Sequence, residues 1–141
     1  MLDVMFREGT DFTVLDRSRG EWGKAADDVS SMTINYLFFG LLKTNGKELD
    51  KDFKLLYETL FDVYHKETSD YELSEVIQPF YAFRGLVVAS PIWYPNISLD
   101  TRRKLFNFIW KVLEAEKFDY KGVDRYLEGS IEIQQQGCLR V

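Results

Sequence analysis

Apolar residues recur every three or four positions along most of this chain, with polar residues between them. Residues at that spacing share one face of an α-helix, so the pattern predicts helices that each bury one side. The predicted helices cover residues 27–43, 49–65, 71–89 and 98–114, with a shorter one near 119–127. Because Pro79 removes a backbone donor inside the third stretch, we expect a kink or a break there.

Two of these predicted helices have distinctive faces. In residues 27–43 the apolar positions cover most of the helix surface, so we expect this helix to be central and buried. Asn45 and Gly46 follow it, a pair typical of a helix C-terminus. In residues 98–114 Ser98 can cap the start. The periodicity there places five apolar residues inward: Leu105, Phe106, Ile109, Val112 and Leu113.

The start of the chain follows a different pattern. Two short β-prone runs, 4–7 and 11–15, flank a turn that contains Gly9, which is typical of a β-hairpin. Two strands alone are marginally stable, so we expect them to pack on the helices or on a further part of a larger protein. The sequence therefore predicts an α+β fold, mainly α, with a short N-terminal β-hairpin followed by a bundle of four or five helices.

The composition is that of one folded domain. The chain has 141 residues, of which 45% are hydrophobic and 16% aromatic. A disordered chain has too few such residues to offset its loss of conformational entropy by burial. We expect a single domain over residues 1–129 and a flexible tail over 130–141, where no periodicity is visible.

Charge and the scarcity of two residue types exclude several kinds of function. Eighteen Lys and Arg against 23 Asp and Glu give a net charge of −5, which argues against a nucleic-acid partner. The single cysteine, Cys138, permits neither an internal disulfide nor a cysteine-based zinc site. The single histidine, His65, is the only imidazole that could act as a base or a metal ligand.

No targeting or membrane signal is visible in the sequence. Charged residues interrupt positions 1–20, so no apolar signal core can form. The apolar stretch 36–42 is far shorter than the roughly 20 residues that a membrane span needs. We therefore expect a cytoplasmic protein with no membrane partner.

The segment 15–29 holds the candidate chemistry. Asp16 follows a predicted strand and leads into a loop with two glycines, and Asp27 and Asp28 open the buried helix. Carboxylates on rigid elements hold Mg²⁺, which prefers a few hard oxygen ligands and keeps several waters. The same pattern is also typical of a turn residue at Asp16 and an N-cap at Asp27 or Asp28. Both interpretations remain open on these residues alone.

Six segments of the chain resemble one known family. They are 15–23, 26–29, 35–39, 83–86, 90–95 and 102–106, which read LDRSRGEWG, ADDV, NYLFF, FRGL, SPIWYP and RRKLF. Together they are similar to the region after the catalytic loop in the aminoglycoside phosphotransferase family, which shares the kinase-like fold with choline kinases. The resemblance covers most of the chain up to about Asp119 and implies the C-terminal lobe of a protein-kinase-like fold.

The resemblance also implies roles for particular carboxylates. Asp16 matches the aspartate at a strand end that binds Mg²⁺, and Asp28 matches the acid that opens the next helix and braces the loops. Asp3 stands where the family has a metal-binding asparagine, so the implied metal ligands are Asp16 and Asp3. In an intact relative the cofactor is Mg²⁺ with ATP, and the partner is a small-molecule substrate whose hydroxyl receives the phosphoryl group.

Other parts of the family pattern are missing from these residues. The His-Gly-Asp catalytic loop would lie before Met1, and neither the glycine-rich loop nor the lysine of the ATP-covering lobe is present. We therefore expect a natural truncation or an excised piece that is inactive as a kinase by itself. The alternative is a non-catalytic helical interaction module, in which apolar surface on the hairpin favours a homodimer.

Arg84 falls on the apolar face of the predicted helix 71–89. An arginine in such a place is usually paired internally with a carboxylate, and Asp28 is the expected partner. The alternative is that Arg84 binds a substrate anion. The sequence thus names Asp28 and Arg84 as residues that brace the loop.

Overall fold

A computed structural model of the chain describes residues 4–6, 8–9, 11–14 and 23–129. The long helices are α1 (Ala25–Lys43), α2 (Lys51–Thr68), α4 (Gln78–Ala89) and α5 (Leu99–Glu114). The short ones are α3 (Leu73–Val76), the 3₁₀ turn η1 (Tyr120–Gly122) and α6 (Val123–Leu127). The helices α1, α2 and α5 thus have ends within a few residues of the predicted ones, whereas α4 covers only the second part of the helix predicted over 71–89.

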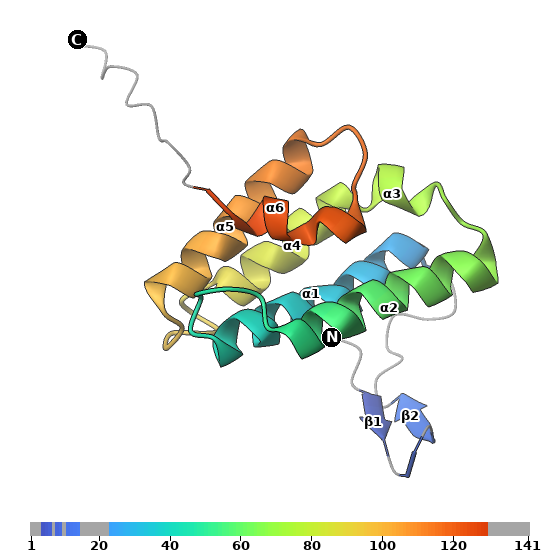
Figure 1. The fold of residues 1–141 in the computed structure, drawn as a ribbon, viewed down its shortest axis with the longest axis horizontal. Helices are drawn as coiled ribbons and strands as arrows, with labels where there is room; N and C mark the ends of the chain where they lie inside the picture. Colours follow the sequence, from blue (N-terminus) through green and yellow to red (C-terminus); the bar gives the residue numbers. More distant parts are fainter. Residues whose placement is uncertain (1–3, 7, 10, 15–22, 130–141) are drawn as a thin grey trace.

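The predicted α+β class is wrong, and the fold is helical. Two segments of three residues, β1 (Val4–Phe6) and β2 (Phe12–Val14), pair antiparallel with Val4 opposite Val14. Among the described elements these segments contact only each other, and no sheet layer covers a helix (Figure 1). Six residues in two strands bury too little apolar surface to form a layer. The N-terminal β-hairpin is therefore no part of the fold, which the helices alone make.

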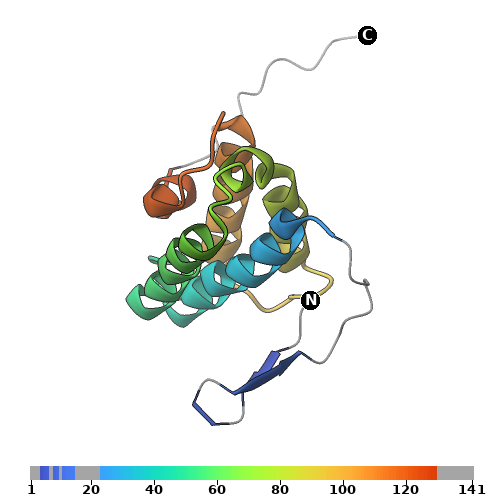
Figure 2. The same ribbon diagram turned by 90° about the vertical axis from the view of Figure 1, so that its right-hand side faces the viewer.

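Helix α1 lies at the centre of the helical body. It runs beside α2 on one side and packs against α4 and α5 on the other (Figures 1 and 2). Most of its surface is buried, with Leu37, Phe38 and Leu41 almost completely covered. The prediction of a central, buried helix is confirmed. None of the helices in the described part of the chain is long and apolar enough to cross a membrane.

The break predicted at Pro79 is confirmed. Helix α3 ends at Val76 and α4 begins at Gln78, so Ile77 alone separates them. Pro79 lies in the first turn of α4, where its missing N–H would have no intrahelical acceptor. The predicted helix 71–89 is therefore two helices, and only α4 packs along α5.

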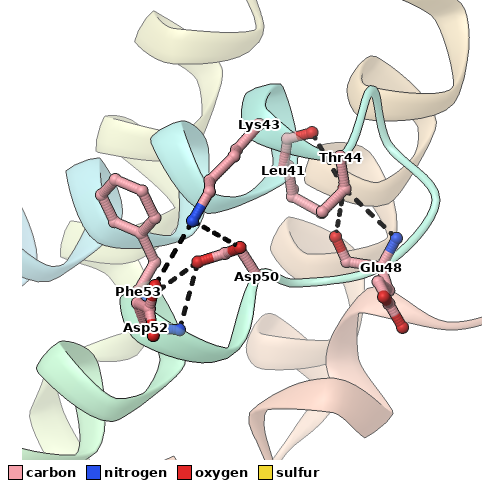
Figure 3. A network of polar contacts seen from close by, with 7 residues as sticks. All are labelled: Leu41, Lys43, Thr44, Glu48, Asp50, Asp52 and Phe53. Carbon is pink, nitrogen blue, oxygen red and sulfur yellow. Dashed lines mark hydrogen bonds and ion pairs between the residues drawn. The ribbon is translucent and has the colours of Figure 1, made fainter.

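The turn from α1 to α2 is held by a polar network (Figure 3). The Lys43 ammonium lies 2.9 Å from an Asp50 carboxylate oxygen, and that carboxylate caps α2 by accepting from the backbone N–H groups of Asp52 and Phe53. These contacts raise the pKa of Lys43 and lower the pKa of Asp50, in both cases mainly through their mutual hydrogen bond. The network fixes α2 beside α1.

The end of α1 explains why Asn45 and Gly46 stand there. The Gly46 N–H donates to the Leu41 carbonyl at 2.8 Å and the Asn45 N–H donates to the Leu42 carbonyl at 3.1 Å. These two bonds form a Schellman motif, which ends a helix by a residue in the left-handed region. Asn45 has φ +55° and Gly46 has φ +78°, so the predicted C-terminal signal is confirmed in its geometry.

The predicted inward face of α5 is correct only in part. Leu105, Ile109 and Val112 are buried. Phe106 and Leu113 are 39% and 53% exposed, although the periodicity places them inward. They lie at the edge of the apolar stripe that turns away from α1, and no described element covers that edge. The apolar stripe of α5 is thus wider than the core that it contacts.

Two tyrosines with a raised pKa should make the free energy of unfolding decrease at alkaline pH. Burial and a hydrogen bond to Asp70 raise the pKa of Tyr64 to about 12, and burial and a hydrogen bond to Asp62 raise the pKa of Tyr120 to about 12. The unfolded chain releases these protons near pH 10, so the contribution of the two tyrosines to the free energy of unfolding should be constant below about pH 10 and fall between pH 10 and 12.

Urea unfolding measured at intervals from pH 9 to 12 tests this expectation. The double variant Tyr64→Phe/Tyr120→Phe should lose stability less steeply above pH 10 than the unchanged chain. Other groups with a raised pKa, such as the buried Tyr81, leave a residual slope in that variant. An equal slope in both proteins would contradict the assignment of the pH dependence to Tyr64 and Tyr120.

Candidate functional site

The candidate site is built around the start of α1. This helix begins at Ala25, and Gly23 and Lys24 separate it from the segment 15–22, which carries Asp16 and lies outside the described residues. Its N-cap, Lys24, makes no side-chain capping bond. Asp27 and Asp28 stand in the first turn, where negative charge is favourable beside the free N–H groups and the positive end of the helix dipole.

An ion pair ties this first turn to α4. The Arg84 Nη2 atom donates to the Asp27 Oδ1 atom at 2.6 Å. The Arg84 side chain is only 11% exposed and that of Asp27 is 29% exposed. A charge-assisted bond between partly buried groups is stronger than a surface ion pair, because water competes less for both partners. The start of α1 is therefore held in a fixed place relative to α4.

The pairing of Arg84 with Asp28, expected from the sequence, is wrong by one residue. Successive residues of a helix point about 100° apart, so Asp27 and Asp28 cannot both face α4. Asp27 turns toward Arg84, and Asp28 is exposed on the outer side of α1. The prediction that Arg84 is paired internally with a carboxylate of this segment is confirmed, with Asp27 as that carboxylate.

A second set of polar contacts joins α1, α4 and α2 inside the core. The hydroxyl groups of Thr33 and Tyr81 are 2.6 Å apart, and the Tyr81 hydroxyl donates to the Tyr57 hydroxyl at 3.4 Å. The Thr33 hydroxyl is also 2.6 Å from the Val29 carbonyl oxygen. Burial raises the pKa of both tyrosines, so they remain neutral donors and acceptors. These contacts keep buried hydroxyls satisfied and fix α4 against α1.

A shallow hollow of about 270 Å³ opens beside the start of α1. Its lining includes Lys24, Asp70, Glu72 and the apolar side chain of Phe80. Asp70 is already engaged, because it accepts from the Tyr64 hydroxyl at 2.6 Å and from the Leu73 N–H at 3.2 Å. The hollow therefore offers the Lys24 ammonium and the Glu72 carboxylate, and these do not form a set of ligands.

The metal ligands implied by the sequence cannot be placed. Asp3 and Asp16 lie outside the described residues. Within residues 23–129 and the described parts before them, no three His, Cys, Asp or Glu side chains gather in a way that could hold a metal ion. The magnesium site thus stays a prediction from the sequence.

Sequence reasoning missed a second hollow near the lone histidine. About 470 Å³ of space lies between the end of α2 and the segment before η1, lined by His65, Tyr71, Lys117 and Tyr120. The His65 ring stacks on Tyr71 with ring centroids 5.6 Å apart, and its buried Nε2 atom meets no hydrogen-bond partner among the described residues. No periodicity or motif in the sequence indicates this hollow. Its residues come from two distant parts of the chain, and these come together only because the segment 117–120 lies beside the end of α2.

No family model matches the chain, and no curated protein or solved structure is significantly similar to it. The resemblance to a kinase-like family therefore stays a prediction from the sequence motifs.

Proposed function

We propose that this chain is the C-terminal lobe of a small-molecule kinase of the aminoglycoside phosphotransferase type. The observation that carries the proposal is the ion pair between Arg84 and Asp27. It fixes the helix that begins shortly after the segment carrying Asp16, and a metal carboxylate on a loop works only if the loop is held in one geometry. The bracing that the resemblance assigns to Asp28 falls to Asp27 in this proposal.

In an intact enzyme of this kind, Asp16 and Asp3 would hold Mg²⁺ together with the phosphates of ATP. A magnesium ion bound there neutralises charge on the phosphates, which is the main requirement of phosphoryl transfer. The substrate in this proposal is a small molecule with a hydroxyl group. Carboxylates are sufficient protein ligands for such a site, which agrees with a chain that has one histidine and one cysteine.

The chain alone is expected to be inactive in this proposal. Phosphoryl transfer needs a carboxylate that orients the attacking hydroxyl and a lobe that grips the nucleotide phosphates. The sequence from Met1 to Val141 contains neither a His-Gly-Asp loop nor a glycine-rich loop with its lysine. A metal carboxylate without those groups supplies only a part of the stabilisation that the transition state requires.

Titration with Mn²⁺ in place of Mg²⁺ tests the remnant site. Paramagnetic Mn²⁺ bound near Asp16 should broaden the amide NMR signals of Ala25 and Ala26, the residues that open α1, in the presence of ADP. Asp16→Ala should abolish the broadening. Asp28→Asn is the matched control, because it removes one exposed carboxylate of the same segment and should leave the broadening unchanged.

One result would contradict the proposal, and another would contradict only the expected inactivity of the chain alone. Broadening that is absent, or that survives Asp16→Ala, would remove Asp16 from any metal site. Turnover of ATP by the chain alone, with a panel of amino alcohols and aminoglycosides and lost in Asp16→Ala, would show that the expected inactivity is wrong.

A further inference from the structure

One face of the helical body is strongly apolar and uncovered by any described element. It is formed by the outward sides of α4 and α5, and it will be called the α4–α5 face. Its members are Phe83 (60% exposed), Leu86 (53%), Phe106 (39%), Trp110 (55%) and Leu113 (53%). Single exposed apolar residues are ordinary on a protein surface, whereas a group of five large ones on two neighbouring helices is not.

The two rows of the α4–α5 face are adjacent because α4 and α5 approach closely. Gly85 provides the contact point, since a Cβ atom there would lie 2.6 Å from Ile109 Cγ1. Leu86 follows Gly85 directly, and Trp110 follows Ile109 directly, so both turn to the same outer side of the contact. Phe106 and Leu113 flank Ile109 at spacings of three and four residues. The face is therefore one continuous patch.

The size of the α4–α5 face suits the centre of a protein interface. Large side chains exposed to this extent present on the order of 500 Å² of apolar surface. A stable interface buries about 800 Å² on each partner, with an apolar centre and a polar rim. Trp is also the residue type that most often anchors such a centre. The patch supplies more than half of that area, and the polar residues around it would have to supply the rest.

The charges beside this patch are complementary to a second copy of the same patch. Arg103 precedes Trp110 by seven residues and Glu114 follows it by four, so all three lie on one side of α5. Arg103 is held only by an exposed contact to Asp100, 3.2 Å away. Glu114 has no ion-pair partner within residues 23–129. When two copies of α5 lie antiparallel about a two-fold axis between Phe106 and Trp110, each Arg103 faces the partner's Glu114.

We propose that a second copy of this chain docks on the α4–α5 face through an antiparallel contact of the two α5 helices. Phe106 of each copy packs on the Trp110 of the other, and the charges of Arg103 and Glu114 set the direction of the pairing. This surface differs from the hairpin, which the sequence analysis considered for a homodimer. The inference does not depend on kinase activity, since neither Asp16 nor Asp27 takes part.

Sedimentation velocity of the full chain over a concentration series tests the proposal. We expect a reversible dimer in the micromolar range. Trp110→Glu should raise the dissociation constant at least about 30-fold, because it places a charge at the centre of the contact. Leu55→Glu on α2, a residue 64% exposed outside the α4–α5 face, is the matched control and should leave the dissociation constant unchanged.

Charge reversal provides a test that leaves the apolar centre intact. Arg103→Glu and Glu114→Arg should each weaken the dimer about fivefold, and the double variant should restore it. Circular dichroism of each variant shows whether it is folded, and these surface charge variants give a result even if Trp110→Glu does not fold. A chain that stays monomeric at all concentrations would overturn the proposal. So would a dimer lost in Leu55→Glu, or a double variant no tighter than the single ones.

Discussion

Gly46→Ala is expected to lower the free energy of unfolding by about 3 kcal/mol, more than any other substitution of a turn residue in this chain. Gly46 has φ +78°, a conformation that a residue with a Cβ atom adopts at a cost. A Cβ atom there would also meet the backbone of α5, at the Thr101 nitrogen and 2.7 Å from the Asp100 carbonyl carbon. Backbone cannot rotate away as a side chain can, so the turn and the start of α5 must separate.

Urea unfolding of the variant at neutral pH measures this loss. Gly23→Ala is the control, because no atom of the described residues lies within 4 Å of a Cβ atom placed there and the residue has no positive φ. Gly23→Ala should be near neutral. A Gly46→Ala protein that is as stable as the unchanged chain would mean that the end of α1 does not rest against the start of α5.

Arg84→Met is expected to lower the free energy of unfolding by about 2 to 3 kcal/mol. The substitution keeps the apolar stem and removes the guanidinium, so Asp27 loses its bond to Arg84 in a place where only 29% of its side chain is exposed. Loss of a charge-assisted bond between partly buried groups costs more than the loss of a surface ion pair. The same variant should loosen the start of α1, which hydrogen exchange at Val29 and Ser30 would detect.

A double-mutant cycle identifies the partner of Arg84. Asp27→Asn should destabilise the chain by itself and should cost less in the Arg84→Met background than in the unchanged chain, because the two residues share one interaction. Asp28→Asn should change stability by less than about 0.5 kcal/mol in either background, as an exposed residue does. Coupling of Arg84 to Asp28 instead of Asp27 would contradict the geometry described above.

The positions of the long helices follow from local pattern, whereas their packing does not. Spacing of three and four residues predicts α1, α2 and α5 within a few residues, and the break before α4 follows from Pro79. Phe106 and Leu113 fit the same periodicity as Ile109 and are nevertheless exposed. Periodicity reports that a face is apolar, but which part of that face is covered depends on where the neighbouring helices lie.

The candidate site could likewise be predicted only in part from the sequence. Sequence reasoning found that Arg84 needs a carboxylate near the start of α1, because a buried arginine is rarely left unpaired. It named Asp28 instead of Asp27, because the correct choice depends on the rotation of α1 about its own axis. That rotation is set by the burial of Leu37, Phe38 and Leu41 in the core between the helices.

By itself, the sequence determined that this chain forms helices and, for α1, α2 and α5, where they lie to within a few residues. The magnesium carboxylates that it names stay a prediction. The hydrogen bonds, caps and breakers of a helix involve residues that are close together in the sequence, so local patterns predict them. Only the tertiary structure decided that the N-terminal strands form no layer of the fold, that Asp27 holds Arg84, and that an apolar face remains open on α4 and α5. Those outcomes depend on contacts between residues far apart in the chain, whose geometry no local pattern contains.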